Sequence, residues 1–101
     1  MPARYGSETH RTNARHHAIR RAAQRYGLAF VMRDVIEHEA MIRYGLTKLV
    51  LWSGNESSRA ELHEIQGEFR SYFAVFNPQI RCIVTYIRGP HEWPARCRRV
   101  A

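Results

Sequence analysis

The chain has almost no lysine and very little cysteine. Of its 101 residues, Lys48 is the single lysine, and Cys82 and Cys97 are the two cysteines. Two cysteines are too few for the disulfide framework that stabilises small secreted domains. The first residues also lack the hydrophobic stretch of a secretory signal. We therefore expect a reduced, cytoplasmic protein.

Long hydrophobic runs are missing as well. The longest are LVLW at 49–52 and FAVF at 73–76, whereas a membrane-spanning helix needs about 20 apolar residues. We therefore expect no membrane partner. The length predicts a single domain over 1–101 with one modest core. Within it we expect a flexible arm at 1–8 and an irregular basic tail at 89–101.

Motifs for metals and cofactors are absent from the sequence. The six histidines and two cysteines form no C-x2-C and no H-x3-H pair at ligand spacing. There is no G-x-G-x-x-G, no P-loop and no G-x-S-x-G nucleophile motif. The sequence therefore predicts no metal site and no cofactor.

Positive charge dominates what is present. The net charge is +7, and arginine supplies all the basic residues except Lys48. The charge is uneven: residues 1–25 and 68–101 are strongly basic, whereas residues 26–67 are mildly acidic. Arginine's planar guanidinium suits bidentate contacts with phosphate. This asymmetry indicates a polyanionic partner such as RNA.

The first half of the chain has helical periodicity. The first helix is expected to begin between Ser7 and Thr12, either of which is a suitable N-cap, and to run to Tyr26. The second is expected over residues 30–44. Each ends in the letters RYGL, with an arginine in the last turn and a glycine at C′, as is typical of helix ends. The core-facing side of the first helix is expected to carry Arg15, Ile19, Ala22, Ala23 and Tyr26, with Ala18 at its margin.

The second half alternates in the manner of β-strands. Strands are expected over 48–53, 59–65, 68–77 and 81–88, separated by turn signals such as Asn77-Pro78. The third and fourth carry large residues on both faces, which suits central strands or a sheet whose second face meets a partner. The order predicts an α+β fold in which two N-terminal helices precede a four-stranded antiparallel sheet.

Three short patterns resemble a known group. They are H-x3-R-x3-RYG from His17 to Gly27, the aromatic strand YFAVFN at 72–77, and the strand IVT at 83–85. Together they resemble small bacterial and prophage proteins with a RelE-like fold, a group that includes barnase, EndoU, colicin and RelE ribonucleases. The resemblance covers roughly residues 12–88 and implies a metal-independent ribonuclease or toxin, or a catalytically silent phage accessory protein.

Under that resemblance, five residues are candidates for catalysis. RNA cleavage through the ribose 2′-OH needs a base, an acid and positive donors for the developing charge. His17 is the candidate acid or base, and Arg21, one turn further along, is placed to hold the phosphate. Arg81 and Thr85 are expected to share a strand face because their separation is even. Tyr72 would stack on a base or donate its hydroxyl.

Each candidate also has a plain structural interpretation. His17 and Arg21 would belong to a solvated helix face, and Tyr72 to the packing of the sheet. A second acid–base residue beside His17 is missing from the pattern. His63 is an alternative, but its neighbours Glu61 and Glu64 resemble an ordinary exposed strand. The arginines expected to bind nucleic acid are Arg15, Arg20, Arg25, Arg96, Arg98 and Arg99.

The same features fit two further classes of protein. One is a non-catalytic phage or prophage inhibitor that binds a host nucleoprotein or a defence complex such as a CRISPR effector. In a toxin, the corresponding protein partner would be a cognate antitoxin. The other is a homodimer whose two-faced apolar strands meet across an interface. The sequence leaves these alternatives open beside RNA itself.

Overall fold

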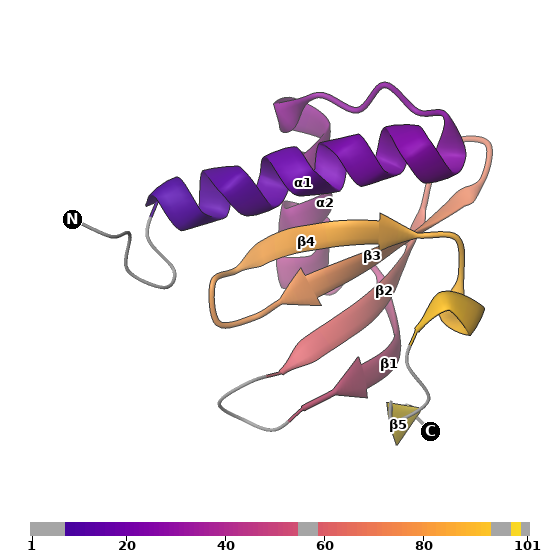
Figure 1. Cartoon of the computed structure of the whole chain (residues 1–101). Helices are drawn as coiled ribbons and strands as arrows, with labels where there is room; N and C mark the ends of the chain where they lie inside the picture. The colour runs from indigo at the N-terminus through magenta and orange to yellow at the C-terminus, as the bar shows by residue number, and fades with distance from the viewer. Residues whose placement is uncertain (1–7, 55–58, 94–97, 100–101) are drawn as a thin grey trace.

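Two helices and a sheet make up the structure, a computed structural model that describes residues 8–54 and 59–93 in full and the backbone of 98–99 (Figure 1). The helices come first, as predicted, and the α+β fold is confirmed. Their bounds are α1 Glu8–Tyr26 and α2 Met32–Arg43. The meander that follows is β1 Lys48–Ser53, β2 Ala60–Gln66, β3 Ser71–Asn77 and β4 Cys82–Ile87.

The C-terminal segment extends this sheet by one short strand. The strand order is β4-β3-β2-β1-β5, and all neighbours are antiparallel. β5, Arg98–Arg99, pairs with the outer edge of β1. Before it lies a single 3-10 turn, η1 Pro90–Glu92. The tail predicted to be irregular over 89–101 thus contains two regular pieces, because the free backbone groups of an edge strand can pair with a further segment.

Both helices end as the repeated letters RYGL predict. Gly27 and Gly45 take the left-handed conformation, with φ of 67° and 73°. The following leucine N–H in each case reaches back to a carbonyl of the last turn, from Leu28 to Ala22 at 3.4 Å and from Leu46 to Met41 at 2.9 Å. These contacts satisfy carbonyls that a helix end leaves free.

The start of α2 is set by one carboxylate. The backbone N–H of Val31 donates to Oδ2 of Asp34 at 2.8 Å. This contact satisfies a backbone donor at the start of the helix, in the manner of a capping box. The helix consequently begins at Met32, two residues later than predicted.

Both helices pack on one face of the sheet, and α1 runs along the edge strand β4 (Figure 1). Ala18 and Ala22 are the fully buried residues of α1, whereas Ala23 is exposed. The predicted apolar stripe was therefore rotated slightly, since Ala18 lies at its centre rather than its margin. The buried cluster between helices and sheet consists of Ala18, Ala22, Val35, Ile42, Ile65, Ala74, Phe76, Ile83 and Tyr86.

A second, smaller cluster lies on the other face of the sheet. It contains Leu51, Leu62, Val75 and Ile87, with the half-buried Trp93 packed against them. The expectation that the third and fourth strands carry core residues on both faces is confirmed. Of the two, β3 is a central strand as predicted, whereas β4 lies at the edge of the sheet, where α1 runs along it.

A β-bulge in the last hairpin changes which residues share a face. Val75 pairs with Thr85 and Phe76 pairs with Ile83, so Val84 is an extra residue on β4. Such an insertion reverses the alternation of side chains beyond it. Ile83 and Tyr86 consequently both face the helices although their separation is odd. The parity argument that put Arg81 and Thr85 on one face is therefore wrong.

Candidate nucleic-acid interface

His17 lies on α1 beside two arginines. His17, Arg20 and Arg21 are spaced i, i+3 and i+4, so they share one side of the helix, and we call these three residues the outer face of α1. Burial lowers the pKa of His17, and the positive charges of Arg21 and Arg20 lower it further. Burial and the neighbouring arginines thus all favour the neutral form of the His17 ring.

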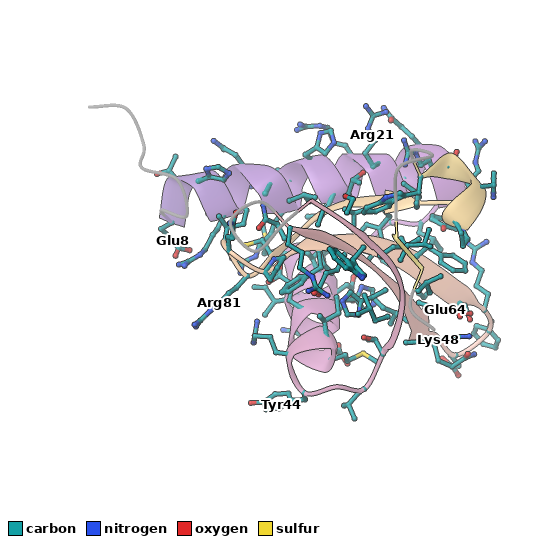
Figure 2. The ribbon with its side chains drawn as sticks, turned by 90° about the horizontal axis from the view of Figure 1, so that it is seen from below. Glu8, Arg21, Tyr44, Lys48, Glu64 and Arg81 are labelled. Atoms are coloured by element: carbon teal, nitrogen blue, oxygen red, sulfur yellow. The ribbon has the colours of Figure 1, made fainter. Side chains whose placement is uncertain are left out.

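Arg21 and Arg81 lie on different sides of α1, and Arg81 belongs to the turn between β3 and β4. Figure 2 shows the two side chains pointing to opposite sides of the helix. Arg81 closes the turn between β3 and β4 with a positive φ of 58°, a left-handed conformation that is unfavourable for a residue with a Cβ. The structure therefore does not bring Arg81 together with His17 and Arg21.

Tyr72 belongs to an aromatic cluster between the sheet and the helices. Its ring centroid lies 5.3 Å from that of Phe30, 5.9 Å from that of His38 and 6.1 Å from that of Tyr26. The ring packs against the main buried cluster. This environment corresponds to the packing role that was the alternative to catalysis for Tyr72.

Thr85 faces the opposite side of the sheet from the helices. It lines a hollow of about 310 Å³ together with Val75, Trp93 and Arg25. Its Oγ1 makes only a long contact of 3.5 Å to the carbonyl of Tyr86. The five residues expected to form one catalytic centre are thus distributed over separate surfaces.

The arginines expected to bind nucleic acid also divide. Arg20 is exposed. Arg25 is held at the edge of the sheet, where its Nη1 donates to the carbonyl of Tyr86 at 2.7 Å and lies 4.0 Å from the Glu92 carboxylate. Arg96 lies outside the described residues, and Arg98 and Arg99 are placed only as backbone in β5.

Arg15 forms a buried ion pair that links three elements. Its Nη2 and Nε lie 2.8 and 3.1 Å from Oε1 of Glu39 on α2, and Nε also lies 3.2 Å from Oε2. The same carboxylate accepts the backbone N–H of Ile83 on β4 at 2.9 Å. Glu39 has no exposed surface, and its hydrogen bonds raise the pKa of Arg15. Arg15 therefore joins α1, α2 and β4.

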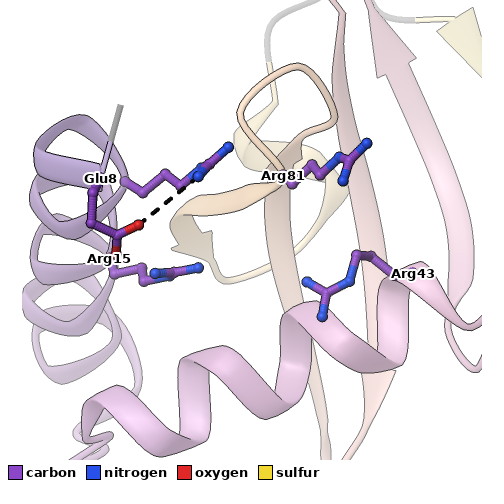
Figure 3. Close-up of a pocket in the computed structure, with 5 residues that line it drawn as sticks. Glu8, Arg15, Arg43 and Arg81 are labelled. Atoms are coloured by element: carbon purple, nitrogen blue, oxygen red, sulfur yellow. Dashed lines mark ion pairs between the residues drawn. The ribbon is translucent and has the colours of Figure 1, made fainter. Parts of the chain in front are cut away.

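Four guanidiniums surround an open hollow in front of that ion pair. It has a volume of about 470 Å³ and is lined by arginines from α1, from the end of α2 and from the β3–β4 turn (Figure 3). We call this set, with one carboxylate at its rim, the arginine hollow. Its residues are Glu8, Arg11, Arg15, Arg43 and Arg81.

The four arginines are held to different degrees. Arg11 donates from Nε to the carbonyl of Ile80 at 3.0 Å, and its Nη1 lies 3.9 Å from Glu8, the ion pair dashed in Figure 3. Arg43 and Arg81 form no hydrogen bond or ion pair with any residue described. Two anchored and two free arginines thus line one hollow.

Two of the arginines that line this hollow were already candidates from the sequence. Arg15 and Arg81 were singled out for different roles, whereas Arg11, Arg43 and Glu39 were missed. A signal for Glu39 exists, because it follows Val35 by four residues and precedes Ile42 by three, which puts it on the buried side of α2. A carboxylate on an apolar stripe requires a cationic partner.

His63 was also misread. It is buried rather than part of an exposed strand. Its Nδ1 lies 2.8 Å from the Thr47 hydroxyl and its Nε2 lies 2.9 Å from Oε1 of Glu61. Glu61 in turn forms an ion pair with Arg59, whose guanidinium stacks on Trp52. His63 is therefore part of a network of hydrogen bonds and ion pairs on the helix-facing side of β2.

Two features of the described residues bear on ligands and membranes. Residues 8–54 and 59–93 contain no group of three or more histidine, cysteine, aspartate or glutamate side chains arranged to hold a metal ion. Among the helices described, none is both long and apolar enough to span a bilayer.

Comparison with known proteins finds no relative. No family model, no curated protein and no solved structure matches the chain. The resemblance to RelE-like proteins therefore stays a hypothesis that rests on the three sequence patterns.

Proposed function

We propose that this chain binds single-stranded RNA through the outer face of α1 and the arginine hollow. The observation that carries the proposal is that arginines on both sides of α1 have positive charges that no carboxylate of the described residues neutralises. Arg20, Arg43 and Arg81 pair with no carboxylate in the described part of the chain, and Arg21 donates to the neutral Gln24 at 3.2 Å. Phosphate oxygens satisfy such free guanidiniums with bidentate, charge-assisted hydrogen bonds.

An exposed aromatic ring supports single-stranded RNA over a duplex. Phe69, in the turn between β2 and β3, is 89% exposed. Its neighbour Arg70 donates from Nη2 to the carbonyl of Tyr26 at 3.0 Å, which holds this turn at the C-terminal end of α1. Unpaired bases stack on exposed aromatic rings, whereas the bases of a duplex are inaccessible to them.

Binding without cleavage is the form of the proposal that the geometry favours. Acid–base cleavage of RNA needs its proton-transfer groups within hydrogen-bond reach of one phosphate. His17 and Arg21 lie on the outer face of α1, Tyr72 lies in the aromatic cluster, and Thr85 lies on the far side of the sheet. Ribonuclease activity therefore stays a prediction that depends on His17 alone.

One assay tests binding and cleavage together. Fluorescence anisotropy with a labelled single-stranded RNA, without divalent metal, is followed by gel analysis of the same samples. We expect salt-sensitive binding by the wild type and weaker binding by the double variant Arg20→Ala/Arg21→Ala. His17→Ala should bind nearly as well as the wild type, because the arginines supply the positive charge of the outer face, and the RNA should stay intact throughout.

A matched control removes the same charge elsewhere. Arg33 is exposed at the start of α2, so Arg33→Ala should bind like the wild type. Cleavage by the wild type but not by His17→Ala would replace the proposal with the ribonuclease. A failure of the wild type to bind RNA would overturn it and leave the protein-directed inhibitor as the hypothesis to pursue.

A further inference from the structure

We infer that the arginine hollow is a site for a phosphate monoester, and that the RNA enters it with a phosphorylated end. This inference rests on the proposed function and adds the chemical group that the site selects. Three observations carry it: arginines from three elements line one hollow, two of them are held in place, and the charges around the hollow leave an excess of positive charge.

The arginines that line the hollow come from three elements that are distant in the sequence. Arg11 and Arg15 project from α1, Arg43 from the last turn of α2, and Arg81 from the β3–β4 turn (Figure 3). A phosphodiester inside a strand offers two free oxygens, which one guanidinium can satisfy. A terminal monoester offers three, so donors arriving from several directions fit it better.

The back of the hollow is fixed in advance. Arg15 is immobilised by three short contacts to Glu39, and Arg11 by its hydrogen bond to Ile80. The left-handed backbone of Arg81 directs that side chain from a tight turn. Side chains that are already ordered lose little conformational entropy when an anion binds, which favours selective recognition over general attraction.

The charge of the site also matches a dianion. Four guanidiniums face the Glu8 carboxylate at the rim and the Glu39 carboxylate behind Arg15, which leaves two positive charges. A phosphodiester carries one negative charge, whereas a monoester carries between about −1.5 and −2 at pH 7. The terminal group therefore neutralises the hollow more completely than an internal phosphate.

The test compares RNA oligomers of one sequence that differ only at their ends. Anisotropy is measured with hydroxyl at both ends, with a 5′-phosphate and with a 3′-phosphate. We expect the wild type to bind one of the phosphorylated forms about tenfold more tightly, the effect of one additional charge-assisted hydrogen bond. Arg81→Ala and Arg43→Ala should each reduce this preference to about twofold or less.

Matched variants separate the site from general charge. Arg33→Ala removes an arginine from the same helix as Arg43 and should keep the full preference. Arg20→Ala/Arg21→Ala should weaken all three oligomers alike. Circular dichroism establishes that each variant is folded, and because Arg43 and Arg81 are both exposed, either one alone suffices to test the inference.

The outcomes distinguish this inference from the proposed function. Equal binding of all three oligomers by the wild type overturns the monoester site while RNA binding stands. Binding of none of them overturns the proposed function. Inorganic phosphate serves as a competitor: if millimolar amounts remove the preference for the phosphorylated end, the monoester chemistry is supported. If inorganic phosphate binds as tightly as the oligomer, the site belongs to the free ion and the assignment to RNA ends is wrong.

Discussion

The two sides of α1 carry similar charge but hold it differently. In the arginine hollow, Arg15 is bound to a buried carboxylate and Arg11 to a backbone carbonyl. On the outer face, Arg20 and Arg21 extend from the helix, and Arg21 reaches only the side chain of Gln24. One side has two ordered arginines at the back of a hollow, and the other is a row of solvated arginines.

This difference corresponds to two ways in which arginines can bind phosphate. Solvated arginines attract phosphates regardless of sequence or position, mainly by releasing counterions, so their contribution falls as salt rises. Ordered arginines recognise a group of definite shape, because they have already lost their conformational entropy in the folded protein. We therefore expect changes to the hollow to alter stability and selectivity, and changes to the outer face to alter affinity alone.

The largest expected effect comes from breaking the ion pair behind the hollow. Among the residues described, Arg15→Ala leaves the buried Glu39 carboxylate with the Ile83 N–H as its one remaining partner. Removing one member of a buried pair costs about 3–5 kcal/mol, and we expect that loss in the free energy of unfolding measured with urea.

Two controls accompany that measurement. Arg20→Ala, on the exposed side of the same helix, should change stability by less than about 0.5 kcal/mol. The double variant Arg15→Met/Glu39→Met replaces the pair by apolar side chains and should recover most of the loss. A cost below about 1 kcal/mol for Arg15→Ala would show that the pair does not hold the three elements together.

The second prediction concerns Cys82, which is buried beside the same ion pair. Burial, followed by the charge of Glu39, raises the pKa of its thiol from about 9 to about 11. At pH 8 the thiolate is then about a hundredfold scarcer than in an unfolded chain. In a Cys97→Ser background, an aromatic disulfide reagent should label Cys82 at least that much more slowly in the folded protein than in guanidinium.

The same shift gives stability a definite dependence on pH. The folded state binds the thiol proton more tightly than the unfolded chain does. The stabilisation that this proton gives the folded state is therefore complete below about pH 9 and is lost as the pH rises to about 11. Rapid labelling at pH 8 in the folded Cys97→Ser protein would mean that the core around Cys82 opens to solvent.

The third prediction concerns the solvated side. Arg20→Ala and Arg21→Ala should each weaken RNA binding several-fold at low salt. If each arginine contacts one phosphate, each change should also lower the slope of log affinity against log salt by about 0.7. Phosphorylated and hydroxyl-ended RNA should be affected equally. A selective loss for the phosphorylated end would place the monoester site on the outer face instead.

Local sequence signals predicted the framework of the fold well. The RYGL repeat encodes both helix ends because glycine takes the left-handed conformation at little cost. The alternation of residues 71–77 correctly separated Phe73 and Val75 on one face from Tyr72, Ala74 and Phe76 on the other. These features depend on neighbouring residues only, so they can be read from the chain itself.

The site was harder to predict because it depends on distant contacts. The bulge at Val84 invalidates the parity argument that joined Arg81 to Thr85, and nothing in the local sequence marks it. His63 is buried because Thr47, from the loop before β1, lies against it. The arginine hollow requires the ends of α1 and α2 to meet one turn of the sheet, and only tertiary packing brings them together.

The smallest expected effect is a difference in stability that separates the backbone strain at Arg81 from the charge of its side chain. Arg81→Gly and Arg81→Ala both remove the guanidinium, so both should lose the preference for a phosphorylated RNA end. They should differ in stability, because alanine keeps the left-handed strain that costs a residue with a Cβ about 1–2 kcal/mol. Glycine removes that strain but loses about 0.5–1 kcal/mol in chain entropy. Arg81→Gly should therefore be more stable than Arg81→Ala in urea unfolding, by up to about 1.5 kcal/mol. The opposite order would mean that the turn relaxes in the variants and that the hollow is less rigid than its arginine contacts imply.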